Sequence, residues 1–184
     1  MKKNISKKIY STQYNSPLGN ILLASDGENL IGLWIEEQKY FVDNFEVETM
    51  IIKDSLEIFV KTKKWLDRYF NSEKPSISEL ELAPIGSEFR TSVWKILCDI
   101  PYGETRTYGE IAKMMAKKLN KNSMSAQAIG NAVGHNPISI IIPCHRVVGK
   151  DGNLTGYAGG IDKKIKLLEL EGVDLSKFYS PKNM

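Results

Sequence analysis

The sequence has no long apolar run, and this absence excludes one large class of protein. No apolar segment of the chain approaches the ~20 residues needed to span a bilayer. The first ten residues, MKKNISKKIY, contain lysines but no apolar core after them, so they do not resemble a secretory signal. We therefore expect a cytoplasmic protein that does not associate with membranes.

Cysteine is equally scarce, with Cys98 and Cys144 as the two examples. A disulfide scaffold would normally show more cysteines at regular spacing. The sequence also lacks a CxxC motif or a Cys/His cluster of the kind that binds structural zinc. We expect no metal site and two free thiols, of which one could be reactive.

Charge is distributed unevenly along a chain of ordinary globular composition, with 42% hydrophobic and 26% charged residues. Residues 1–85 contain 11 Lys/Arg and 13 Asp/Glu, whereas residues 86–184 contain 14 and 9. The first half is therefore slightly acidic and the second half basic. This asymmetry indicates that the second half binds a polyanion such as a nucleic acid.

The pattern of apolar residues predicts an α/β (α+β) protein of two domains. Short alternating runs predict strands at 9–14, 20–24 and 30–35, and a helix is expected at about 55–71, before a linker from Pro75 to Pro84. The expected domains are a small mixed α/β domain at 1–85 and a mainly helical domain at 86–184.

Three helices are predicted in the second half, at about 89–100, at 108–119, and from Ser123 or Ser125 to about Gly134. The last two, joined by a short polar turn, have the outline of a helix-turn-helix, although two ordinary packed helices would give the same pattern. The third helix carries many small residues, which permit close approach to the protein interior or to a narrow groove. These residues are Ala126, Ala128, Gly130, Ala132 and Gly134.

An apolar run, 138–142, directly precedes the most reactive residue types of the chain. We predict a short buried strand that ends at Pro143 and is followed by Cys144, His145 and Arg146. These residues could be a core cysteine beside a surface histidine, or a Cys/His hydrolase dyad. In an extended strand neighbouring side chains point to opposite faces, so proton transfer between them would need a turn or a water.

The segment GNAVGHNPISIIIPCHRVVG, residues 130–149, closely resembles the active-site segment of the O6-alkylguanine-DNA alkyltransferases, also called methylated-DNA–protein-cysteine methyltransferases. The Pro-Cys-His-Arg core is highly specific, and Gly156-Tyr157, Gly159-Gly160 and Leu170-Glu171-Gly172 follow at the family's spacing. The resemblance is strong over residues 86–173. In the first half it rests on the fragments SPLGNILLA and GLWI.

The resemblance implies a ribonuclease-H-like N-terminal domain and a winged-helix-like DNA-binding domain. It implies irreversible, single-turnover transfer of the alkyl group from O6-alkylguanine, and also from O4-alkylthymine, to a cysteine after base flipping. No cofactor is implied. The implied partner is double-stranded DNA, bound in the minor groove without sequence preference by a monomer.

The resemblance also implies a role for individual residues. Cys144 would accept the alkyl group, His145 would take the thiol proton through water, and Glu171 would orient His145. Asn136 would brace the turn around the nucleophile, and Tyr108 would donate a proton toward N3 of the flipped guanine. The pocket would be walled by Val147, Tyr157 and Ala158, and Arg146 would tie the active-site turn to the domain.

The residues expected to contact DNA lie mainly on the helix-turn-helix. They are Gln127, Ala126, Arg146, Lys113, Lys117, Lys118 and Lys121. Many family members have an arginine, inserted in place of the flipped base, where this sequence has Gln127.

Two rival functions remain open. Alkyltransferase-like proteins recognise the same lesions without a cysteine at this position, and Cys144 argues against that interpretation. A Cys/His hydrolase would turn over repeatedly, whereas an alkyltransferase would react once.

Overall fold

We analysed a computed structural model of the chain, which describes residues 8–41 and 45–180. The protein divides into two compact units, each described by itself. The first comprises residues 1–85 together with 137–139, and the second comprises 86–136 together with 140–184. Among the described residues, no helix is both long and apolar enough to cross a membrane.

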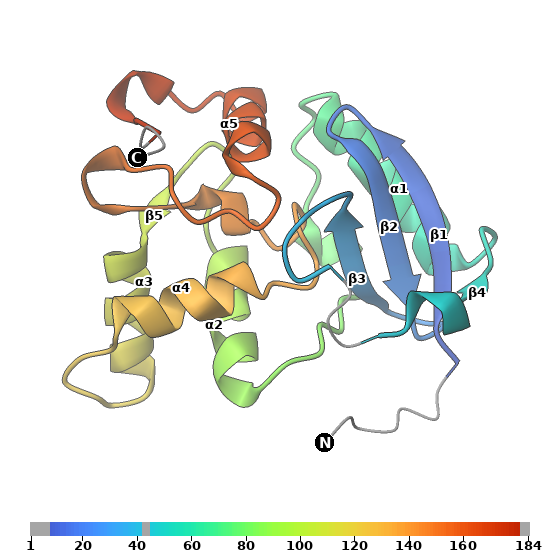
Figure 1. The fold of residues 1–184 in the computed structure, drawn as a ribbon, viewed down its shortest axis with the longest axis horizontal. Coiled ribbons are helices and arrows are strands. Elements are labelled where there is room, and N and C mark those ends of the chain that lie inside the picture. Colours follow the sequence, from blue (N-terminus) through green and yellow to red (C-terminus); the bar gives the residue numbers. More distant parts are fainter. Residues whose placement is uncertain (1–7, 42–44, 181–184) are drawn as a thin grey trace. The chain divides into compact units, whose positions relative to one another are not determined.

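The first unit is built on a four-stranded sheet with the strand order β3-β2-β1-β4 (Figure 1). β1 pairs antiparallel with β2, β2 pairs antiparallel with β3, and the short β4 pairs parallel with β1. The bounds are β1 Tyr10–Ser16, β2 Gly19–Ser25, β3 Leu30–Ile35 and β4 Ile51–Ile52. The three predicted strands are therefore confirmed to within a few residues, whereas β4 was not predicted.

One helix, α1 (Glu57–Phe70), packs against β1 and β2 and buries Phe59 and Leu66. A short segment from much later in the chain also joins this unit. The backbone N–H of Leu33 donates to Pro137 O at 2.8 Å, and that of Ser139 donates to Leu33 O at 3.0 Å. Ile138 thereby adds a single parallel bridge to the free side of β3.

The second unit is mainly helical (Figure 1). Its helices are α2 Glu88–Cys98, α3 Tyr108–Lys118, α4 Ala126–Gly134 and α5 Ile161–Leu170. The three predicted helices are confirmed. Ser125 caps α4 by accepting a hydrogen bond from Ala128 N, and Thr107 and Glu110 form a capping box at the start of α3.

A two-stranded parallel ribbon completes the second unit. β5 (Arg106–Thr107), just before α3, pairs with β6 (Val147–Val148), just after Cys144. The ribbon therefore joins the beginning of α3 to the end of the Pro-Cys-His-Arg segment. A mixed α/β unit followed by a mainly helical one agrees with the predicted fold class.

Candidate active site

Cys144 lies in a tight turn, and the prediction of a strand before it was wrong. Residues 138–142 are buried, but only Ile138 makes a strand-like bridge. Ile140 has a positive φ of 71°, which turns the chain. Cys144, His145 and Arg146 then form one turn of 3-10 helix, so Cys144 and His145 are not held on opposite faces of a strand.

Asn136, the second residue after the end of α4, braces this turn. Its Nδ2 donates to the carbonyl oxygen of Ile142 at 2.8 Å and lies 3.1 Å from Sγ of Cys144. Both Asn136 and Cys144 are buried. The amide therefore fixes the backbone before the cysteine and supplies a donor to the sulfur itself.

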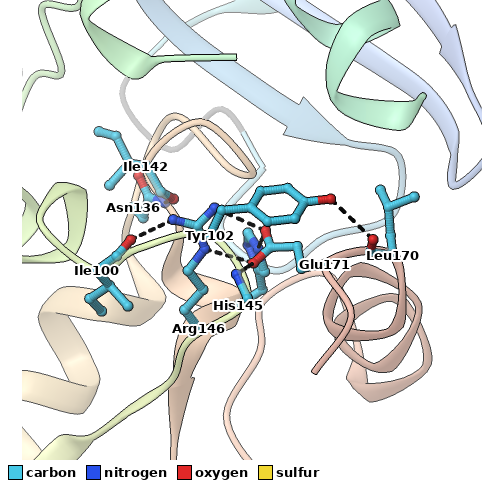
Figure 2. A network of polar contacts seen from close by, with 9 residues as sticks. Ile100, Tyr102, Asn136, Ile142, His145, Arg146, Leu170 and Glu171 are labelled. Carbon is cyan, nitrogen blue, oxygen red and sulfur yellow. Dashed lines mark hydrogen bonds and ion pairs between the residues drawn. The ribbon is translucent and has the colours of Figure 1, made fainter. Parts of the chain in front are cut away.

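The buried carboxylate of Glu171 contacts the polar side chains of His145 and Arg146 in this turn (Figure 2). Nε2 of His145 lies 2.6 Å from Glu171 Oε1. Arg146 donates from Nε to Oε2 at 2.8 Å and from Nη2 to Oε1 at 3.0 Å. The backbone N–H of Gly103 adds a fourth donor at 3.1 Å. Glu171, only 5% exposed, is thus surrounded by donors on both oxygens.

These contacts determine the protonation of the network. Burial acts to raise the pKa of Glu171, but the hydrogen bonds and charges of His145 and Arg146 outweigh it and hold the pKa well below its usual value. Burial lowers the pKa of His145, so the imidazole is neutral near pH 7 even though Glu171 opposes the shift. An ionised carboxylate accepts hydrogen bonds only, so His145 must carry its proton on Nε2, and Nδ1 then has the basic lone pair.

The thiol of Cys144 is protonated at rest. Burial raises its pKa, while the hydrogen bond from Asn136, the charge of Lys164 and the backbone N–H groups of Cys144 and His145 act to lower it. The site therefore holds a neutral thiol among groups that would stabilise the thiolate when it forms.

Lys164 supplies a buried ammonium group near Cys144 that was not predicted from the sequence. Its side chain is fully buried on α5, and its Nζ donates to Val147 O and, at 3.3 Å, to Thr155 O. Burial lowers its pKa to about 8, and the nearby Cys144 opposes this shift. A signal was present, because Lys164 shares a helical stripe with the apolar Ile161, Ile165 and Leu168.

A second set of predicted residues lies on β6, on the loop that follows it, and at the start of α3, where Tyr108 reaches that loop. The hydroxyl of Tyr108 donates to Gly156 O at 3.1 Å and lies 3.4 Å from Thr155 O. Burial, and then Cys144, raise the pKa of Tyr108 to about 12, so it keeps its proton near neutral pH. Val147 and Tyr157 are buried, and Ala158 is partly exposed.

Comparison with known proteins assigns this arrangement to a family. Residues 9–84 match the family model of the 6-O-methylguanine DNA methyltransferase ribonuclease-like domain, and residues 88–173 match the DNA binding domain of the same name. A methylated-DNA–protein-cysteine methyltransferase of Haemophilus influenzae is 42% identical over 165 residues, covering 90% of this chain and 87% of the relative. The chain belongs to the methylated-DNA–protein-cysteine methyltransferase family.

Further relatives extend the likeness to nearly full length. The family member of Methanosarcina acetivorans is 45% identical and is covered over 99% of its length, with 89% of this chain matched. The crystal structure of Mycobacterium tuberculosis OGT in complex with DNA matches with a TM-score of 0.75 and 41% identity. That match covers 88% of this chain and 92% of the other. The fold is therefore that of the methyltransferase family in both units.

The side chains expected to contact DNA are mostly exposed. Gln127 and Ala126 are exposed in the first turn of α4. Four lysines are exposed on α3 and just beyond it: Lys113, Lys117, Lys118 and Lys121.

Arg146 is the exception, because it is 6% exposed and its guanidinium bonds Glu171 and, at 2.6 Å, Ile100 O. Arg146 thus ties the active-site turn to the rest of the second unit, the role that the family resemblance implied, and its guanidinium is not exposed for the expected contact with DNA. Cys98, the second thiol, is partly buried, and burial raises its pKa to about 11.

Proposed function

We propose that this protein repairs DNA by transferring the alkyl group of O6-alkylguanine to Sγ of Cys144. The observation that carries the proposal is the buried Cys144–Asn136 contact beside the His145–Glu171 pair, in a chain of the methylated-DNA–protein-cysteine methyltransferase family. The same pocket would accept O4-alkylthymine. The reaction uses no cofactor.

The transfer is an in-line displacement at the saturated carbon. His145 takes the thiol proton on Nδ1 through a bridging water, and Glu171 stabilises the imidazolium that results. The new S–C bond forms as the bond between the alkyl carbon and O6 breaks. Because no residue of the site can hydrolyse a thioether, each molecule reacts once.

The leaving guanine needs a proton or hydrogen-bond donor, because it departs poorly as an anion. Tyr108 is suited to this role, since its hydroxyl stays protonated and donates to Gly156 O in the free protein. On base entry the hydroxyl would exchange this carbonyl for N3 of the guanine. Val147, Tyr157 and Ala158 would wall the pocket.

The target atom lies inside the duplex, so the damaged base must be flipped out. We propose that the C-terminal domain, residues 86–184, binds double-stranded DNA as a monomer in the minor groove, with the small residues of α4 allowing close approach. The exposed lysines of α3 and Lys121 would contact phosphates without sequence preference. Residues 1–85 would form the α/β domain, to which residues 137–139 add a backbone bridge. We place this activity in the cytoplasm.

Incubation with duplex DNA containing O6-methylguanine, followed by intact mass measurement, tests the proposal. We expect one methyl-sized increment per molecule, located on Cys144 by peptide mapping. Repeated turnover with no mass increment would instead support a Cys/His hydrolase. Lesion binding without transfer would support a binding module.

A further inference from the structure

The last described residues of the chain lie against the loop that carries the pocket wall (Figure 1). We define the C-terminal strap as Leu175–Tyr179 and the pocket loop as residues 149–157. The backbone N–H of Leu154 donates to Tyr179 O, and that of Tyr179 donates to Gly152 O, both at 3.0 Å. The strap and the pocket loop are therefore joined by two backbone hydrogen bonds.

Gly152 is where the two segments approach most closely. A Cβ added there would lie 2.2 Å from Lys177 O and 3.3 Å from Phe178 Cα, and Gly152 has a φ of +86°. No side chain fits such a gap without displacing the backbone of the strap. The contact is thus backbone against backbone, which leaves the loop little freedom to shift.

Apolar side chains hold the strap in place. Leu175 and Phe178 pack against a buried cluster formed by Val148, Leu154 and Leu168. Val148 belongs to β6, directly after the Cys144 turn, and Leu154 belongs to the pocket loop. The strap therefore packs against β6, which follows the Cys144 turn, and against the pocket loop.

The end of the pocket loop contacts two groups of the candidate site. Thr155 O accepts from Lys164 Nζ, and Gly156 O accepts from the Tyr108 hydroxyl, and Tyr157 follows at once. A displacement of Gly152 or Leu154 would move these two carbonyl oxygens, and with them the hydroxyl and ammonium groups that they orient. The DNA binding family model ends at residue 173, before the strap begins.

We propose that the C-terminal strap is a positioning element for alkyl transfer: it fixes the pocket loop so that Tyr108 and the wall at Tyr157 meet the guanine base in register with Cys144. This inference rests on the proposed function. The strap would contact neither the substrate nor the thiol of Cys144, and it would affect the reaction only by fixing the position of the pocket loop.

The test compares two full-length glycine variants that carry the same type of backbone strain. Gly152→Ala places a Cβ against the strap. Gly27→Ala, in a turn of the first unit, also has a positive φ, of +108°, but its Cβ would meet only Tyr10, at an ordinary 3.5 Å. Two rates are measured at Cys144 by peptide mass: benzyl transfer from free O6-benzylguanine, which needs the guanine pocket, and methylation by methyl iodide, which needs only the thiol.

We expect the ratio of the two rates to fall roughly tenfold or more in G152A, since a displacement of about 1 Å can cost on the order of a hundredfold in rate. The ratio should be unchanged in G27A. An equal ratio in the two variants would overturn the role of the strap. If the parent protein took no methyl group from O6-methylguanine DNA, the proposed function itself would fail, so the two failures are distinct.

A second pair of variants covers the case in which G152A does not fold. Phe178→Ala loosens the strap and leaves the sequence of the pocket loop unaltered, while Val93→Ala truncates a fully buried apolar side chain of α2, outside both segments. The same ratio should fall in F178A and stay at the parent value in V93A. A parent-like ratio in F178A would show that a loosened strap has no effect on base placement.

Discussion

Replacing Glu171 by glutamine should separate the chemistry of the active site from its stability. The substitution keeps the shape of the side chain but removes a charge that His145, Arg146 and Gly103 all contact. Glutamine would hold His145 less firmly in the Nε2–H tautomer and would not stabilise the imidazolium. Because positioned general bases contribute about 10²–10⁴-fold, we expect transfer to slow by at least roughly a hundredfold.

The cost in stability follows from Arg146, whose buried guanidinium would lose its counter-charge. Removing one partner of a buried ion pair typically costs about 3–5 kcal/mol. The native pKa of Glu171 is lowered, so its contribution is present above its unfolded pKa of ~4.3 and is lost as the pH falls toward the native pKa. The difference in stability between parent and E171Q should therefore be full near neutral pH and should narrow only in acid.

The assay measures transfer from O6-methylguanine DNA in single-turnover mode, together with urea unfolding over a range of pH. Glu169→Gln, at an exposed residue of α5 two positions before Glu171, makes the same change of charge and should behave as the parent. Adding Arg146→Met to E171Q should recover part of the stability, because the unpaired charge is removed, but none of the rate. A parent-like rate for E171Q would refute our assignment of Glu171 to the proton path.

Three further predictions concern the two thiols and Gln127 of α4. Cys144→Ser should abolish transfer while gel-shift assays still show lesion binding, and Cys98→Ser should retain transfer; the reverse pattern would exchange their roles. Methylation of Cys144 places an extra group in a buried site, which typically costs ~1–3 kcal/mol, so the methylated protein should melt at a lower temperature, and equal melting would contradict this. Gln127→Ala should slow transfer on duplex DNA much more than on free O6-benzylguanine, whereas Gln127→Arg should equal or exceed the parent; equal losses on both substrates would place Gln127 in the pocket.

The sequence predicted those helices and strands that depend on residues close together along the chain. The three long strands and the helices α1 to α4 follow from apolar periodicity, and the start of α4 follows from a serine cap at Ser125. The association of Cys144, His145 and Glu171 could be expected only from the family pattern, because Glu171 lies 26 positions from His145 along the chain. The contacts of Glu171 with His145 and Arg146 are visible only in the three-dimensional structure.

Two expectations depended on features that the sequence does not signal. An apolar run from 138 to 142 shows that the residues are buried, but burial is the same in a strand and in a turn. The turn depends on Ile140 at positive φ, which is rare for a β-branched residue and is not signalled by composition. Arg146 was grouped with the DNA contacts, but its guanidinium is buried, where it bonds Glu171 and the carbonyl oxygen of Ile100.

The bridge between Ile138 and β3 has a consequence for dissecting the chain. A fragment that stops at residue 85 would lack residues 137–139, and Leu33 would lose both the donor and the acceptor that complete its backbone hydrogen bonds. An uncovered strand edge is a template for pairing with other chains. A fragment that starts at residue 86 would in turn carry Ile138, which is fully buried in the intact protein, without the strand that it pairs with. A cut between residues 85 and 86 would therefore leave neither fragment with a complete set of contacts. A circularly permuted or split version of the protein should keep residues 137–139 together with β3.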